Sequence, residues 1–109
     1  MISWDDFKKV EMRVGRIIEA NDFPKARKPA YQLKIDFGNF GIKQSSAQIT
    51  DLYSKEDLVG KQIVAVTNLG KKQIANFISE CLVLGVILED GKVVLIETER
   101  DVPCGLKIE

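Results

Sequence analysis

The chain has 109 residues, in which 16 Lys and Arg balance 16 Asp and Glu, and it contains no histidine. This length predicts a single domain over residues 1–109, large enough to bury a core without disulfides or metals. A content of 45% apolar and 29% charged residues excludes a disordered chain. The missing histidine removes the commonest general base and the commonest metal ligand. We therefore expect a binding protein with no catalytic residues, no metal and no cofactor.

The cysteines and the N-terminus bear on the compartment. Cys81 and Cys104 form no CxxC spacing, so neither a zinc site nor a disulfide framework is expected. Cys81 lies in an apolar run, which predicts a buried, unreactive thiol. The first residues lack a signal-peptide pattern, and the longest apolar run, residues 81–88, is far shorter than the ~20 residues of a membrane-spanning helix. These features predict a cytoplasmic protein without membrane insertion.

The N-terminal half predicts a short helix followed by three strands. Ser3 is typical of a helix N-cap, and apolar residues at three-residue spacing give that helix one apolar face. Residues 12–18 then read as a strand, in which Gly15 indicates a bulge or a sharp bend. After an exposed loop between two prolines, residues 31–37 alternate as a half-buried strand. Gly38-Asn39 predicts a tight hairpin turn, with residues 40–49 as the return strand.

The C-terminal half predicts a second short helix and three further strands. A capping box begins a helix over residues 54–60, and residues 62–67 form a β-rich run. A polar connection over residues 68–80 leads to strands 81–88 and 93–98, which pair across an Asp-Gly turn. This order predicts an all-β fold with short helices: a five-stranded OB-fold Greek-key barrel, preceded by a helix and extended by an additional C-terminal strand.

Positive charge is concentrated in one part of the chain although the net charge is zero. Residues 25–50 contain five Lys and Arg against one acid. In an OB-fold, these residues and the loop between the fourth and fifth strands face bound oligonucleotides. The alternative is that they are ordinary solvated cations of exposed loops. The candidate residues for contacts with nucleic-acid phosphates are Lys25, Arg27, Lys28, Lys34, Lys43, Lys71 and Lys72.

The late strands are apolar on both faces. Residues 81–88 and 93–96 do not alternate, so both faces of this strand pair are expected to be buried. A small barrel has one interior, so another surface has to cover the outside. The N-terminal helix or a second subunit can do so, and we favour a homodimer in which both the helix and the late strands take part. The alternative is cover by the chain's own termini.

Several short blocks resemble the tRNA-binding domain family. They include Arg13-Val14-Gly15-Arg16-Ile17, Ile35-Asp36-Phe37-Gly38 and Leu58-Val59-Gly60-Lys61. Three further blocks resemble the CsaA branch of that family, which consists of small export-related chaperones. They are Phe23-Pro24-Lys25-Ala26-Arg27-Lys28-Pro29-Ala30-Tyr31, Ser46-Ala47-Gln48-Ile49-Thr50 and Lys72-Gln73-Ile74-Ala75.

The resemblance implies an OB-fold homodimer that binds unfolded or precursor polypeptides for protein export. A stand-alone dimeric protein that binds tRNA by its structure is the alternative, and the seven candidate Lys and Arg residues would then be its tRNA-binding residues. An extended client needs apolar pockets and polar groups for its main chain. The candidate peptide-binding residues are therefore Phe40, Gln48, Gln73, Ile74, Asn76 and Phe77. For Phe40 and Phe77 the alternative is an ordinary place in the barrel core.

Overall fold

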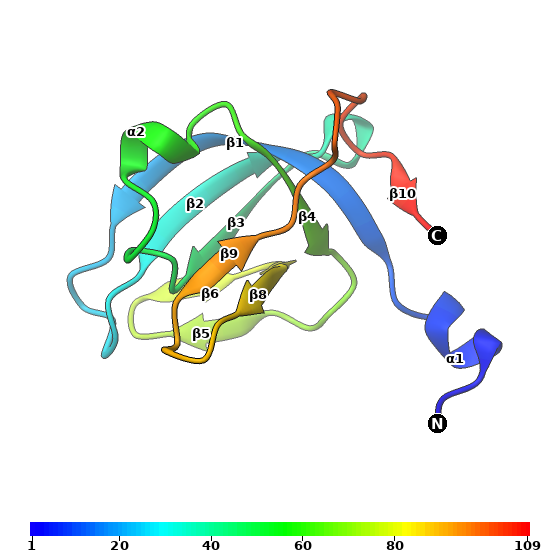
Figure 1. The fold of residues 1–109 in the computed structure, drawn as a ribbon, viewed down its shortest axis with the longest axis horizontal. Helices are drawn as coiled ribbons and strands as arrows, with labels where there is room; N and C mark the ends of the chain where they lie inside the picture. The colour runs from blue at the N-terminus through cyan, green and yellow to red at the C-terminus, as the bar shows by residue number, and fades with distance from the viewer.

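A long, curved strand organises the fold, which a computed structural model describes over all 109 residues (Figure 1). The elements, in chain order, are α1 (Trp4–Lys8), β1 (Met12–Asp22), β2 (Tyr31–Asp36), the 3-10 helix η1 (Gly38–Phe40), β3 (Ile42–Ala47), α2 (Lys55–Leu58), β4 (Gln62–Val66), β5 (Lys72–Ile74), β6 (Phe77–Ser79), β7 (Leu82–Val83), β8 (Gly85–Ile87), β9 (Val93–Leu95) and β10 (Lys107–Ile108). No helix among them is long and apolar enough to cross a membrane.

The main sheet has the strand order β3-β2-β1-β4-β7, and all of its neighbouring strands are antiparallel. It curls into the barrel that the strand order predicts, and β10 pairs with the start of β1 as the additional C-terminal strand. The register between β1 and β2 shifts between Ile17 and Glu19, so the irregularity lies beyond Gly15. Gly15 instead leaves room for the core: a Cβ there would lie 2.5 Å from a methyl of Ile35 and 2.7 Å from the ring of Phe37.

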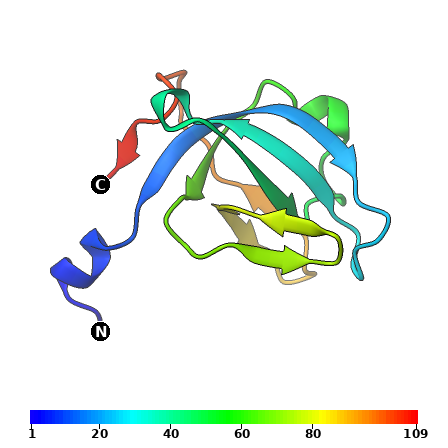
Figure 2. The ribbon, with the colours of Figure 1, turned by 180° about the vertical axis from the view of Figure 1, so that it is seen from behind.

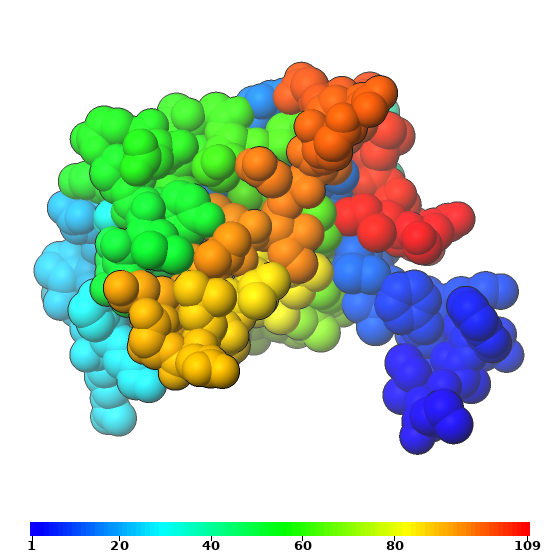
Figure 3. Space-filling model, viewed as in Figure 1, coloured from blue at the N-terminus to red at the C-terminus, as the bar shows by residue number.

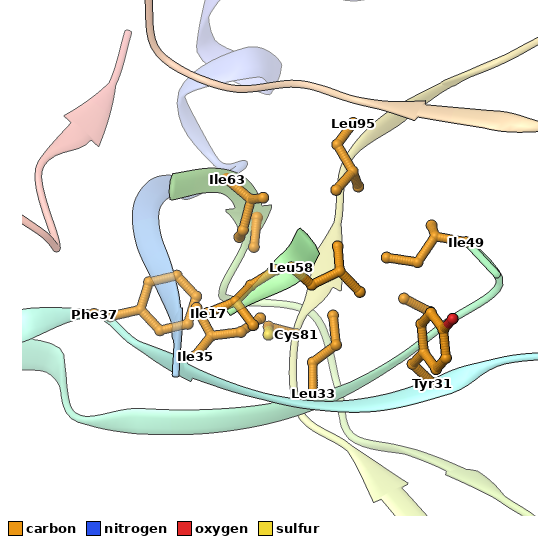
Figure 4. Close-up of a cluster of buried hydrophobic side chains, with 12 residues drawn as sticks. Ile17, Tyr31, Leu33, Ile35, Phe37, Ile49, Leu58, Ile63, Cys81 and Leu95 are labelled. Atoms are coloured by element: carbon orange, nitrogen blue, oxygen red, sulfur yellow. The ribbon is translucent and has the colours of Figure 1, made fainter. Parts of the chain in front are cut away.

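The barrel interior is packed by apolar side chains from the sheet and from α2 (Figure 4). Leu33, Ile35 and Phe37 point inward from β2 and from the residue after it, and none of them is accessible to solvent. Leu58 of α2 is also fully buried among them. The predicted capping box is confirmed at Ser54, whose hydroxyl accepts from the N–H of Asp57 at 3.1 Å. A short capped helix thus holds one leucine in the barrel.

Two predicted connections have a different structure. The turn after β2 is the 3-10 helix η1, because Gly38 and Gly41 both have positive φ angles and the N–H of Phe37 bonds to the carbonyl of Gly41. Phe40 therefore belongs to this turn, and β3 begins only at Ile42. The connection over residues 68–80 contains the β5–β6 hairpin, which Ala75 turns with a φ of 52°. Each of its strands has only three residues, which is too short for a clear pattern in the sequence.

The late strands correct the expectation that both of their faces are buried. The run of residues 81–88 breaks at Leu84: β7 stays in the barrel beside β4, whereas β8 leaves it and pairs with β9 as a separate ribbon. Val86 and Ile87 of that ribbon are 52% and 76% exposed.

The termini do not cover this ribbon. The helix α1 stands off from the barrel as a separate lobe (Figure 3), and its Trp4 is 86% exposed. The C-terminal strand β10 lies against β1 instead, with Met12 opposite Ile108. Cover by the N-terminal helix of the same chain, or by the chain's own termini, is therefore wrong.

Candidate binding groove

A groove of about 1100 Å³ lies beside the barrel. One side is the loop of residues 23–30, which joins β1 and β2, together with the end of β3. The other side comprises residues 69–75, which lead into β5, and the strands β7, β8 and β9. The groove thus lies between the two loops that flank the ligand face of an OB-fold.

The groove has a basic rim and an apolar floor. Its charged lining residues are Lys25, Arg27, Lys28 and Lys72, and no Asp or Glu lines it. Most of the other lining residues are apolar, and they come from three separate parts of the chain. The apolar lining residues with side chains larger than alanine are Ile49, Leu69, Ile74, Cys81, Leu82, Val83, Leu84, Ile87 and Val93. Such a surface suits a ligand that combines apolar groups with negative charge.

A small second core holds the two loops of the groove together. The rings of Phe23 and Phe77 lie 5.5 Å apart at an angle of 55°, and both side chains are buried with Ala30. Figure 2 shows the consequence: the turn of the β5–β6 hairpin lies beside the loop of residues 23–30. Phe77 therefore supports the groove from below and does not line it.

Polar side chains close the barrel where β3 meets the chain after β6. The hydroxyl of Ser45 is buried and donates to the carbonyl of Cys81 at 2.8 Å. Ser45 thus has a structural role.

Burial raises the pKa of the Cys81 thiol to about 11, so the thiol stays protonated at neutral pH, as its apolar setting predicts.

The predicted tRNA-binding residues fall into two groups. Lys25, Arg27, Lys28 and Lys72 line the groove, and the exposed Lys71 lies next to Lys72 in the chain. Lys34 and Lys43 line a second, smaller hollow of about 370 Å³, which they share with Glu19 and Glu80. The ammonium of Lys34 lies 3.6 Å from the carboxylate of Glu19, so part of its charge is neutralised. The two groups thus line separate hollows.

The predicted peptide-binding residues are also divided. Gln48 and Ile74 line the groove, but Gln73 bonds within its own turn, to the carbonyl of Ala75 at 3.2 Å. Asn76 lies in that turn and is exposed. Phe40 is not in the groove: the guanidinium of Arg13 stacks on its ring at 3.6 Å.

Several lining residues were not among the candidates. Leu82, Val83, Ile87 and Val93 come from the late strands, which the sequence shows to be apolar on both faces. That pattern indicated that the late strands make a second apolar contact. It did not indicate that these strands border the same groove as the loop of residues 23–30, because the two segments are far apart in the sequence.

Residues 12–107 of the chain match the family model described as "Putative tRNA binding domain". This range includes the whole main sheet and both loops that flank the groove.

Two solved structures resemble the chain over its full length. The chaperone CsaA of Bacillus anthracis str. Ames is 50% identical with a TM-score of 0.96, and the match covers 100% of this chain and 99% of that one. The CsaA chaperone protein of Picrophilus torridus is 55% identical with a TM-score of 0.93, and both chains are covered completely.

A larger enzyme contains a similar segment. The methionine–tRNA ligase of Pelodictyon phaeoclathratiforme is 39% identical over 109 residues, which is all of this chain but 15% of the ligase. The chain therefore spans about 15% of the length of that relative.

Proposed function

The chain belongs to the tRNA-binding domain family, and we propose that it acts as a CsaA-type chaperone that binds unfolded or precursor polypeptides for export. The observation that carries the proposal is the groove, whose apolar floor offers pockets to side chains of an extended client. The similarity to two CsaA chaperones over the full chain supports it. Such a role needs neither a cofactor nor a catalytic residue, and it places the protein in the cytoplasm, where precursors are made.

The proposal includes a homodimer. Val86 and Val94 lie opposite each other in the β8–β9 ribbon, are 52% and 37% exposed, and do not line the groove. Trp4 and Phe7 of the separate lobe α1 are exposed as well, and soluble monomers usually avoid large exposed apolar patches. A dimer also presents two grooves, and a long client bound in both gains affinity through its effective concentration.

Structure-specific tRNA binding is the second candidate function. The acid-free basic rim supports it, because lysines and arginines that neutralise phosphates supply most of the affinity for nucleic acid. The similarity to a segment of methionine–tRNA ligase supports it as well. A dimer would present two basic rims to the shape of a folded RNA.

Titrations of labelled tRNA and of a labelled unfolded polypeptide, followed by fluorescence anisotropy at two salt concentrations, separate these functions. We expect tRNA binding to depend steeply on salt and polypeptide binding to depend on salt less steeply, because apolar contacts supply part of its affinity. Leu69→Ser removes an exposed apolar side chain from the groove and should weaken polypeptide binding. Leu52→Ser is the control, since Leu52 is similarly exposed outside the groove. Equal binding by both variants, or no polypeptide binding at all, would contradict the chaperone proposal.

A further inference from the structure

The free edge of β3 is closed along only part of its length. Gln44 uses both of its main-chain groups there: its N–H donates to the carboxylate of Glu80 at 3.0 Å, and its carbonyl accepts from the N–H of Glu80 at 2.8 Å. Two residues further on, the N–H of Ser46 donates to the hydroxyl of Ser79 at 3.1 Å. Ser79 and Glu80 therefore take the place of a neighbouring strand along this stretch, with side chains in two of the three bonds.

Beyond Ser46 the same edge is open. The carbonyl of Ser46 receives only a long contact, 3.4 Å from the hydroxyl of Ser45, and the main chain of Gln48 makes no hydrogen bond. Buried and less buried residues continue to alternate as far as Ile49, so the backbone stays extended after the last paired residue. Alternate residues of an edge strand direct their main-chain groups to the same side. The N–H of Gln48 thus points to the side on which Gln44 bonds Glu80.

This open edge forms a wall of the groove. Residues 46–49 line it on one side, and residues 82–85 of β7 and β8 line it on the other. An extended segment that lies between them can use the open main-chain groups of β3 and the apolar floor at the same time. The basic rim favours a segment with negative charge. Four Lys and Arg residues line the groove and no Asp or Glu does, so the groove is electrostatically complementary to acidic side chains.

We propose that the groove binds an extended polypeptide segment with acidic and apolar side chains, which adds to the edge of β3 as a further strand. A carbonyl of the segment accepts from the N–H of Gln48, and an N–H of the segment donates to the carbonyl of Ser46. Alternate side chains then point to the apolar floor, and acidic side chains reach the lysines and arginine of the rim. This inference rests on the proposed function and adds the mode of binding and the class of client.

Modified peptides test the main-chain bonds without changing the protein. A labelled peptide of alternating apolar and acidic residues is compared with versions that carry one N-methyl group at each position in turn. We expect methylation at alternate positions to weaken binding about tenfold, because it removes an N–H donor that pairs with β3, and the intervening positions to tolerate it. Equal affinity for all methylated versions would overturn strand addition while leaving the chaperone proposal intact.

A pair of variants tests the same bond from the protein side. Gln48→Pro removes the main-chain N–H, whereas Gln48→Ala keeps it and removes only the side chain. We expect Gln48→Pro to bind the acidic peptide about tenfold more weakly than Gln48→Ala, with equal melting temperatures of the two variants. Equal affinities of the two folded variants would overturn the inference.

The charge of the client is tested with a peptide in which every acidic residue is replaced by lysine. At low salt we expect it to bind at least tenfold more weakly, with the difference shrinking as salt screens the rim. If the lysine peptide binds equally well or more tightly, the proposal of an acidic client is wrong, whereas strand addition to β3 is not affected. Failure of every peptide and of an unfolded protein to bind overturns the proposed function itself. If tRNA binds in the groove and no peptide does, the groove is an RNA-binding site. That result overturns the inference.

Discussion

The strand β4 and the β8–β9 ribbon are both apolar on two faces, yet β4 is buried along its whole length and the ribbon only at Leu95. All five residues of β4 are buried, and its first residue, Gln62, bonds the C-terminal segment: its amide donates to the carbonyl of Val102 at 2.6 Å and accepts from the N–H of Val102 at 3.1 Å. The ribbon has no such cover, and Ile87 is 76% exposed. Two similar apolar runs thus have different roles: β4 supports the fold, and the ribbon offers contact surface for other molecules.

The sharpest test of this comparison removes apolar atoms from each region. Ile63→Ala truncates a fully buried side chain of β4, and we expect it to lower the free energy of unfolding by about 2–5 kcal/mol. Val86→Ala, in the ribbon, should change it by less than about 0.5 kcal/mol. Both changes in the free energy of unfolding are measured by urea denaturation, at a protein concentration low enough to keep the chain monomeric. Equal losses would mean that the ribbon is part of the folded core.

Adding atoms tests the barrel from the opposite direction. Gly15→Val places a side chain where Ile35 and Phe37 already lie, and the forced repacking should lower the free energy of unfolding by about 1–3 kcal/mol. Gly70→Ala is the matched control, because a Cβ at Gly70 meets nothing within 4 Å. Thermal unfolding of both variants checks the prediction. A stable Gly15→Val variant would show that this side of the barrel is loosely packed.

Self-association tests whether the ribbon is a contact surface. Val86→Asp combined with Val94→Asp places two charges on the apolar face that points away from the groove. We expect the dimer dissociation constant to rise at least about tenfold, because unpaired charges would be buried in the contact. Sedimentation velocity over a concentration series measures it. Ile42→Asp is the control, since Ile42 is 60% exposed on β3, away from the ribbon, and should leave the constant unchanged.

The smallest expected effect concerns the salt dependence of RNA binding. Lys71→Ala combined with Lys72→Ala removes two cations beside the groove, and the slope of log affinity against log salt should fall by about two phosphate contacts. Anisotropy titrations of tRNA at four or more salt concentrations give the slope. Lys92→Ala combined with Lys107→Ala is the control outside the groove. An unchanged slope in the first variant would exclude both lysines from phosphate contacts.

The candidate site was predictable in part. Lys25, Arg27 and Lys28 lie in one loop between prolines, so local sequence is enough to expose them together. Phe40 shows where this approach fails: its turn depends on two glycines with positive φ and on Arg13, which is distant in sequence. Lys34 and Lys43 were placed on the correct strands, but their carboxylate neighbours Glu19 and Glu80 depend on register and on the closure of the barrel.

The sequence by itself determined the barrel: hydrophobic alternation in β2, the capping box of α2 and the order of the elements along the chain are local patterns, and together they lead to the same fold. Only the tertiary structure decided which apolar strands are covered and where β3 stays open. The local sequence pattern indicates how apolar a strand is, but it does not indicate which other part of the chain packs against that strand. Gln62, at the start of β4, is bonded by the C-terminal segment, and the groove is bordered by β8, which leaves the barrel at Leu84. Both arrangements depend on how distant parts of the chain come together, and no local sequence pattern predicts either of them.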